Sequence, residues 1–71
     1  MKYKLKVDGM ACSMCEAHVN DCIRNNFEVK KVKSHHKNGD VTIECDKPLD
    51  IELLKDIIDK TGYIVLKIEE V

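Results

Sequence analysis

KYKLKVDGMACSMC, residues 2–15, joins an alternating segment to a closely spaced pair of cysteines. In its first half apolar residues alternate with lysines, and a period of two predicts a strand with one solvent-exposed face. The Asp-Gly pair that follows interrupts the alternation, and from about Ser13 the apolar residues recur at helical spacing. The stretch therefore places Cys12 and Cys15 at the junction between a first strand and a first helix.

The rest of the chain can be divided by the same two periodicities and by turn signals. The expected elements are a helix over residues 13–26, strands over 29–36 and 41–45, a helix over 51–60 and a strand over 64–68. Asn38-Gly39 is a hairpin signal between the second and third strands. Asp50 is a good N-cap for the second helix, and Gly62 is suited to end it.

The first helix and the last strand are identified by their apolar patterns. In the first helix one stripe comprises Cys15, Val19, Cys22, Ile23 and Asn26, and another comprises Glu16, Asn20, Asp21 and Arg24. The last strand is indicated by the alternating residues Ile64, Leu66 and Ile68.

The order strand, helix, strand, strand, helix, strand is the split βαβ, or ferredoxin-like, arrangement. It predicts an α+β fold, βαββαβ, in which a four-stranded antiparallel sheet carries two helices on one face. A length of 71 residues leaves room for one domain, residues 1–71. The chain starts at Met1 and stops just after the last strand, which fits a complete small protein and equally a domain excised from a larger one.

The composition excludes several classes of function. Apolar residues make up 44% and charged residues 35%, with 12 Lys plus Arg against 13 Asp plus Glu, which is a globular balance without basic excess. Three aromatic residues are too few for a base-stacking platform, so no nucleic-acid partner is expected. No apolar run approaches the roughly 20 residues that span a bilayer, and no signal peptide is recognisable. We therefore expect no membrane insertion and a cytoplasmic location.

The spacing of Cys12 and Cys15 has a direct chemical consequence. Two intervening residues allow both sulfurs to converge on one point, and the adjacent helix N-terminus stabilises thiolates. Thiolates are soft ligands that favour Cu(I), zinc or iron–sulfur clusters over magnesium or calcium. Structural zinc and iron–sulfur clusters normally take four protein ligands, whereas Cu(I) is held by two or three sulfurs. Ligand count therefore favours one Cu(I) ion between Cys12 and Cys15. The loop lies at the edge of the domain, where a partner can reach it, so our main hypothesis is a binding and transfer module and not an enzyme.

The cysteine pair also fits other interpretations. The two residues can be ordinary thiols, or the site can serve another heavy metal such as Hg(II), Zn(II) or Cd(II). A thiol–disulfide redox protein also carries CxxC between a strand and a helix, although a thioredoxin-type domain is longer and orders its elements differently.

The remaining histidines and cysteines are assigned structural roles. His18 lies one turn after Cys15 and is either a third, nitrogen ligand or a solvated surface residue, of which we favour the second. Cys22 and Cys45 occupy apolar positions and are expected to pack in the core. His35 and His36 point to opposite faces of a strand, so we expect the first to be solvated and the second partly covered.

The sequence resembles the heavy-metal-associated domain family, which comprises copper chaperones and the N-terminal domains of copper-transporting P-type ATPases. The family motif Gly-Met-x-Cys-x-x-Cys is matched by Gly9, Met10, Cys12 and Cys15, and Gly62-Tyr63 resembles the Gly-Tyr of many bacterial members. The resemblance covers the chain from Lys2 to about Glu69.

The resemblance implies a role for each matched residue. Cys12 and Cys15 would coordinate the metal, Met10 would lie in the core, Tyr63 would shield the site, and Lys60 would offset the charge of a bis-thiolate complex. The ion would pass by stepwise thiolate exchange to a CxxC domain of a metal-transporting P-type ATPase or a similar acceptor. The protein would be a monomer, with a metal-bridged dimer as an alternative. Glu16 departs from the apolar residue frequent in the family and is expected to add negative charge beside the site.

Overall fold

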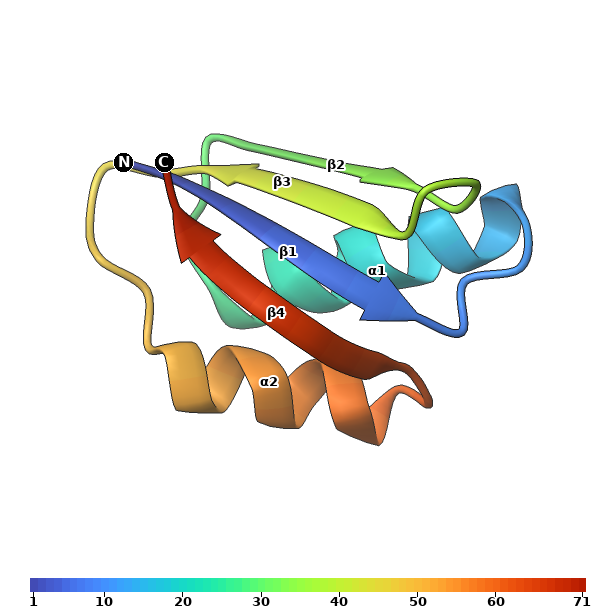
Figure 1. Cartoon of the computed structure of the whole chain (residues 1–71). Helices are drawn as coiled ribbons and strands as arrows, with labels where there is room; N and C mark the ends of the chain where they lie inside the picture. The colour runs from blue at the N-terminus through green and yellow to red at the C-terminus, as the bar shows by residue number, and fades with distance from the viewer.

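The computed structural model describes all residues, 1–71, and has the predicted order of elements (Figure 1). The elements are β1 (Lys2–Asp8), α1 (Ser13–Asn26), β2 (Lys31–His35), β3 (Asp40–Glu44), α2 (Ile51–Lys60) and β4 (Ile64–Glu70). The strands form one antiparallel sheet in the order β2-β3-β1-β4. Both helices lie on the same face of this sheet, α1 against β2 and α2 against β4. The ferredoxin-like α+β arrangement is therefore confirmed.

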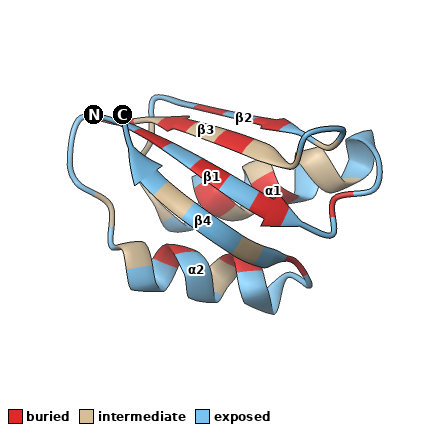
Figure 2. Ribbon diagram, viewed as in Figure 1, coloured by how far each residue is buried: buried red, intermediate tan, exposed pale blue.

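The core lies between the sheet and the helices, where Figure 2 shows the buried positions. Strict alternation in β1, β2 and β3 turns every second side chain towards the helices, as a period of two requires. The fully covered side chains are Leu5, Val19, Ile23, Val41, Ile43, Leu54 and Ile58. In α2, Asp50 caps the first turn by accepting a hydrogen bond from the backbone N–H of Leu53, at 3.2 Å.

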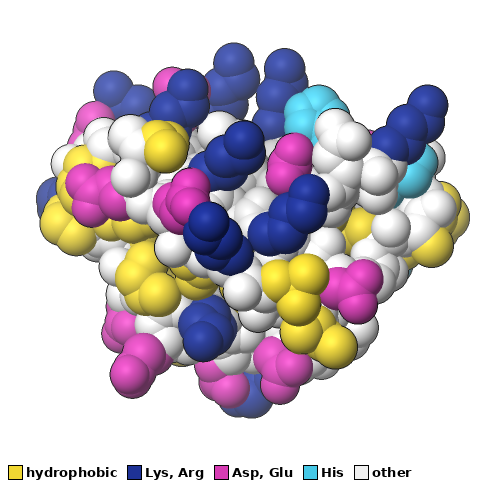
Figure 3. All heavy atoms as spheres, in the orientation of Figure 1, with side chains coloured by type: hydrophobic (Ala, Val, Ile, Leu, Met, Phe, Trp, Pro, Cys, Tyr) yellow, Lys and Arg dark blue, Asp and Glu magenta, His cyan; other side chains and the backbone are white.

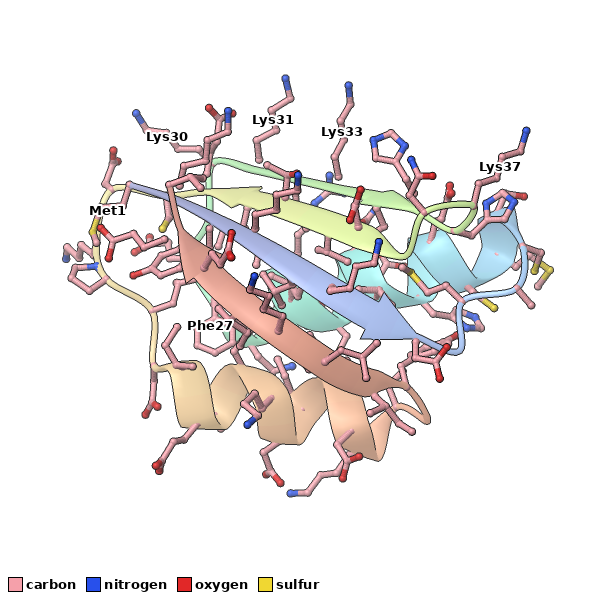
Figure 4. The ribbon with its side chains drawn as sticks, in the orientation of Figure 1. Met1, Phe27, Lys30, Lys31, Lys33 and Lys37 are labelled. Carbon is pink, nitrogen blue, oxygen red and sulfur yellow. The ribbon has the colours of Figure 1, made fainter.

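The opposite face of the sheet is open and carries most of the lysines of the strands. Lys2, Lys4 and Lys6 of β1 share this face with residues of β2 such as Lys31 and Lys33. Figure 4 shows Lys31 and Lys33 pointing away from the helices. In Figure 3 basic side chains gather over the strands with acidic side chains between them, and further acidic side chains lie below, where α2 lies. No helix is long and apolar enough to cross a membrane.

The second strand is shorter than the predicted range 29–36. It ends at His35, where the chain turns through residues 36–39. The backbone N–H of Gly39 donates to the His35 carbonyl at 2.8 Å and closes this turn. At the other end Val29 precedes the strand and packs against the core. The hairpin itself is confirmed, with His35 paired to Asp40.

The last strand departs from simple alternation. The pairing of β1 with β4 shifts register, so that Lys6 faces Lys67 and Val7 faces Val65, which leaves Leu66 as an extra residue. This bulge turns Ile68 and Val65 towards the core, while Ile64 and Leu66 are 56% and 62% exposed. The strand was predicted correctly, but Ile64 and Leu66 do not share the face of Ile68.

Candidate metal centre

The two cysteines of the motif lie where β1 gives way to α1, at the end of the molecule opposite the two termini (Figure 1). Cys12 is extended and forms the N-cap of α1, and its carbonyl accepts the backbone N–H groups of Cys15 and Glu16 at 3.1 and 3.3 Å. This first turn places the two Sγ atoms 3.8 Å apart. Both thiols are free, with Cys12 exposed and Cys15 half-buried. The fold thus brings the two sulfur atoms together at an accessible position.

The surroundings of Cys15 stabilise its thiolate. A hydrogen bond from the Tyr63 hydroxyl, followed by one from the Ala11 backbone N–H, lowers the pKa of Cys15 to about 7. The same hydrogen bond, together with desolvation and the nearby sulfurs, raises the pKa of Tyr63 to about 12. Near neutral pH Cys15 is therefore ready to act as a soft anionic ligand, while Tyr63 keeps its proton.

Gly9 and Tyr63 fit together at the edge of this site. Gly9 has φ +103°, in the region that favours glycine, and a Cβ at this position would lie 3.3 Å from Cδ1 of Tyr63. Tyr63 itself is only 8% exposed. The glycine therefore allows the loop to close over the ring whose hydroxyl reaches Cys15.

Two further residues named from the family resemblance have clear positions. Met10 is buried in the core, as expected. Lys60 is exposed and its Nζ forms an ion pair with Asp56, at 3.1 Å, one helical turn away on α2. The positive charge of Lys60 is thus paired with a carboxylate of its own helix.

Glu16 follows Cys15 but its carboxylate is engaged elsewhere. Oε2 accepts a hydrogen bond from the backbone N–H of His36 at 2.7 Å and lies 2.6 Å from the His36 ring Nδ1. These contacts lower the pKa of Glu16. The sequence predicted a half-covered His36, which is confirmed, but no local signal indicated its partner, because the two residues are 20 positions apart.

The other histidine and cysteine predictions are also resolved. His18 is exposed, as favoured from the sequence, and no group of three or more His, Cys, Asp or Glu side chains is placed to hold a metal ion. Cys45 is buried in the core, as expected. Cys22 was wrongly expected in the core: it is half-buried between the helices, where its Sγ lies 3.2 Å from Oγ1 of Thr61. Cys12 and Cys15 are the two cysteines that the fold brings together at the loop.

Comparison with known proteins relates the chain to metal-handling proteins. The chain is 30% identical over 63 residues to the copper chaperone CopZ of Staphylococcus aureus, which covers 87% of this chain and 93% of CopZ. It is also 30% identical over 70 residues to a mercuric reductase of Lysinibacillus sphaericus, covering 99% of this chain but 13% of that enzyme. No family model matches the sequence.

A solved structure supports the same relationship. The structure of a CopZ metallochaperone superimposes with a TM-score of 0.84 at 28% identity, covering 93% of this chain and all of that one, 100%. The likeness to CopZ extends over nearly its whole length in both sequence and structure. This chain belongs to the heavy-metal-associated domain family, which includes the copper chaperone CopZ.

Proposed function

We propose that this chain binds one Cu(I) ion through the thiolates of Cys12 and Cys15 and delivers it to a CxxC domain of a metal-transporting P-type ATPase or a similar acceptor. The observation that carries the proposal is the pair of free thiols, 3.8 Å apart on an exposed loop. Two thiolates form a soft, low-coordinate donor set, which suits Cu(I) better than metals that require four ligands. Similarity to the copper chaperone CopZ supports this assignment.

The geometry also favours transfer over storage. Cys12 is exposed, so a thiolate of an acceptor can approach the ion from its side. As the incoming sulfur binds the metal, the bond to Cys12 breaks and a second acceptor sulfur then replaces Cys15. The ion keeps at least two sulfur ligands throughout, and each departing thiolate takes up a proton or stays ionised according to its pKa.

Free thiols throughout the chain fit a reducing compartment, and we propose that the protein acts in the cytoplasm. The protein would be monomeric without metal. Because one chain supplies only two sulfurs, two copies sharing an ion through four thiolates form the alternative loaded state.

The similarity to mercuric reductases supports a second candidate function, because the alignment with one of them covers 99% of this chain. The chain spans about an eighth of their length, 13% and 11% for two of them, so their activity does not pass to it by similarity. The corresponding proposal is that the domain carries Hg(II), another soft and thiophilic ion, as one module of a longer protein.

One experiment separates these functions. The reduced protein is loaded anaerobically with Cu(I), Hg(II) or Zn(II), and stoichiometry and affinity are measured by competition with chelators. We expect one tightly held Cu(I), lost in Cys12→Ser and Cys15→Ser. Cys22→Ala is the matched control and should retain the ion, because Cys22 lies between the helices.

Other results would contradict the Cu(I) proposal. Weak retention of Cu(I) with tight retention of Hg(II) would establish the second function. Disulfide reductase activity without retention of any metal would instead show a redox protein. Movement of Cu(I) to an apo CxxC domain of a copper-transporting ATPase, followed after separation of the two proteins, tests the transfer step.

A further inference from the structure

Two polar bridges connect α1 to the β2–β3 hairpin. In the first, Glu16 contacts the backbone N–H and the ring of His36, at 2.7 and 2.6 Å. In the second, the Ser34 hydroxyl donates to Oδ1 of Asn20 at 2.6 Å. Glu16 and Asn20 are one helical turn apart, so both bridges emerge from one face of α1.

This face was expected to belong to a separate polar stripe of the helix. Glu16 and Asn20 are both half-buried, and the side chains of Glu16 and His36 are only 25% and 29% exposed. A carboxylate that accepts a backbone N–H in such a place forms a charge-assisted hydrogen bond, which is stronger than a neutral one. The Glu16 bridge is therefore the stronger of the two.

The position of Glu16 in the helix gives its bridge a special consequence. Cys12 makes no side-chain capping hydrogen bond, so the first turn of α1 lacks the usual anchor. Glu16 is adjacent to Cys15, and its bridge ties this turn to the β2–β3 hairpin. Without it, the turn that carries Cys15 would be held by its own backbone, by apolar packing and by the contact of Cys15 with Tyr63.

We propose that Glu16 is a positioning residue for the metal site, which acts by binding His36 and thereby holding the first turn of α1 and Cys15 against the hairpin. The proposal rests on the proposed function of Cys12 and Cys15. It assigns the carboxylate a role different from the one expected from the sequence. Its Oε2 atom contacts His36 of the hairpin, and the proposal is that its effect on the metal passes through the position of the backbone.

The test compares the two bridges. Glu16→Ala removes the bridge beside Cys15, Glu16→Gln keeps an oxygen that accepts the His36 N–H, and Asn20→Ala removes the matched bridge one turn further along. Hydrogen–deuterium exchange of residues 13–17 is measured on the metal-free protein, and Cu(I) affinity is measured by chelator competition. Urea unfolding of each variant corrects for changes in global stability.

We expect Glu16→Ala to speed local exchange and to weaken Cu(I) binding by about tenfold, the lower end of what loss of an outer supporting contact costs a metal site. Glu16→Gln should stay within about threefold of the wild type, because the amide oxygen can still accept the His36 N–H, although this hydrogen bond is no longer charge-assisted. Asn20→Ala should leave both measurements near the wild-type values even if it lowers global stability as much.

Three outcomes would overturn the proposal. Equal effects of Glu16→Ala and Asn20→Ala would show a general contribution to stability. If Glu16→Gln behaves like Glu16→Ala in affinity while exchange is unchanged, Glu16 acts through its charge on the ion. Unchanged exchange and affinity in Glu16→Ala would show that the other contacts of the turn hold it without Glu16. If the wild type binds no Cu(I), the proposed function fails, and the exchange comparison alone still decides whether Glu16 holds the turn.

Discussion

The hydroxyl of Tyr63 is the group with the most direct influence on the chemistry of the loop. It donates to the Cys15 sulfur and is the largest cause of the fall of the Cys15 pKa to about 7. In Tyr63→Phe the thiolate loses this donor, so the pKa of Cys15 must rise towards its ordinary value of about 8.5. The midpoint of a pH profile of Cys15 alkylation should move upward accordingly. Alkylation near pH 7 should slow several-fold, and the two proteins should converge at high pH, where both are fully ionised.

A second buried tyrosine supplies the control for this measurement. The Tyr3 hydroxyl accepts the backbone N–H of Leu49 at 3.2 Å and takes no part in the loop. Tyr3→Phe should therefore leave the alkylation profile of Cys15 unchanged. An unaltered profile in Tyr63→Phe would show that the helix terminus and the backbone donors set the pKa of Cys15.

Gly9 can be tested against Gly62, because both have a positive φ, +103° and +105°. An alanine at either position is strained by about 1–3 kcal/mol, which urea unfolding would register as a lower free energy. Only at Gly9 would the new Cβ press on the Tyr63 ring, since nothing lies within 4 Å of a Cβ at Gly62. Gly9→Ala should therefore also slow Cys15 alkylation near pH 7, and Gly62→Ala should not. Equal alkylation in both variants would contradict the contact.

The β4 strand offers a similar comparison between neighbouring residues. Leu66 is the extra residue of the bulge and is 62% exposed, whereas Ile68 packs against the core. Leu66→Thr should change the free energy of unfolding by less than about 0.5 kcal/mol. Ile68→Thr should cost about 1–2 kcal/mol, because it removes apolar surface from a partly buried site. Similar losses at both positions in urea unfolding would argue against the bulge.

That bulge also shows where sequence patterns stop being informative. Strict alternation predicted the buried faces of β1 and β3 because each strand keeps one phase along its length. In β4 the phase changes at Leu66, and the cause lies in its pairing with β1. A strand's own sequence does not contain the register of its neighbour, so the alternation that identifies β4 does not reveal that Leu66 and Ile68 lie on different faces.

The sequence of α1 likewise predicted only some of the contacts that this helix makes near the candidate site. Its apolar spacing predicted that Val19 and Ile23 would be buried, as they are. Glu16 and Asn20 are polar, and helical spacing alone does not reveal that a hairpin with matching donors lies beside them. The cysteine pair was evident from spacing, whereas the position of Tyr63 beside Cys15 followed from family resemblance alone.

The arrangement of the fold separates the loop from the ends of the chain. Both termini lie at one end of the sheet, and the Cys12–Cys15 loop lies at the other (Figure 1). The backbone N–H of Val71 donates to the Lys2 carbonyl at 2.8 Å, which fixes the two ends side by side. A protein fused at either end would therefore leave the loop accessible, consistent with relatives of this length and with much longer ones.

A small domain should also respond as a unit to a ligand at its edge. An ion that binds only the folded state stabilises it by about 2.7 kcal/mol when its free concentration is 100 times the Kd. For a domain of this size each kcal/mol raises Tm by roughly 4–8 °C, so buffered Cu(I) should raise Tm by roughly 10–20 °C in anaerobic calorimetry. Cys22→Ala should keep this shift, and Cys12→Ser with Cys15→Ser should abolish it. A shift that survives in the double variant would place the stabilising ion elsewhere, because the loop would then supply no thiolate.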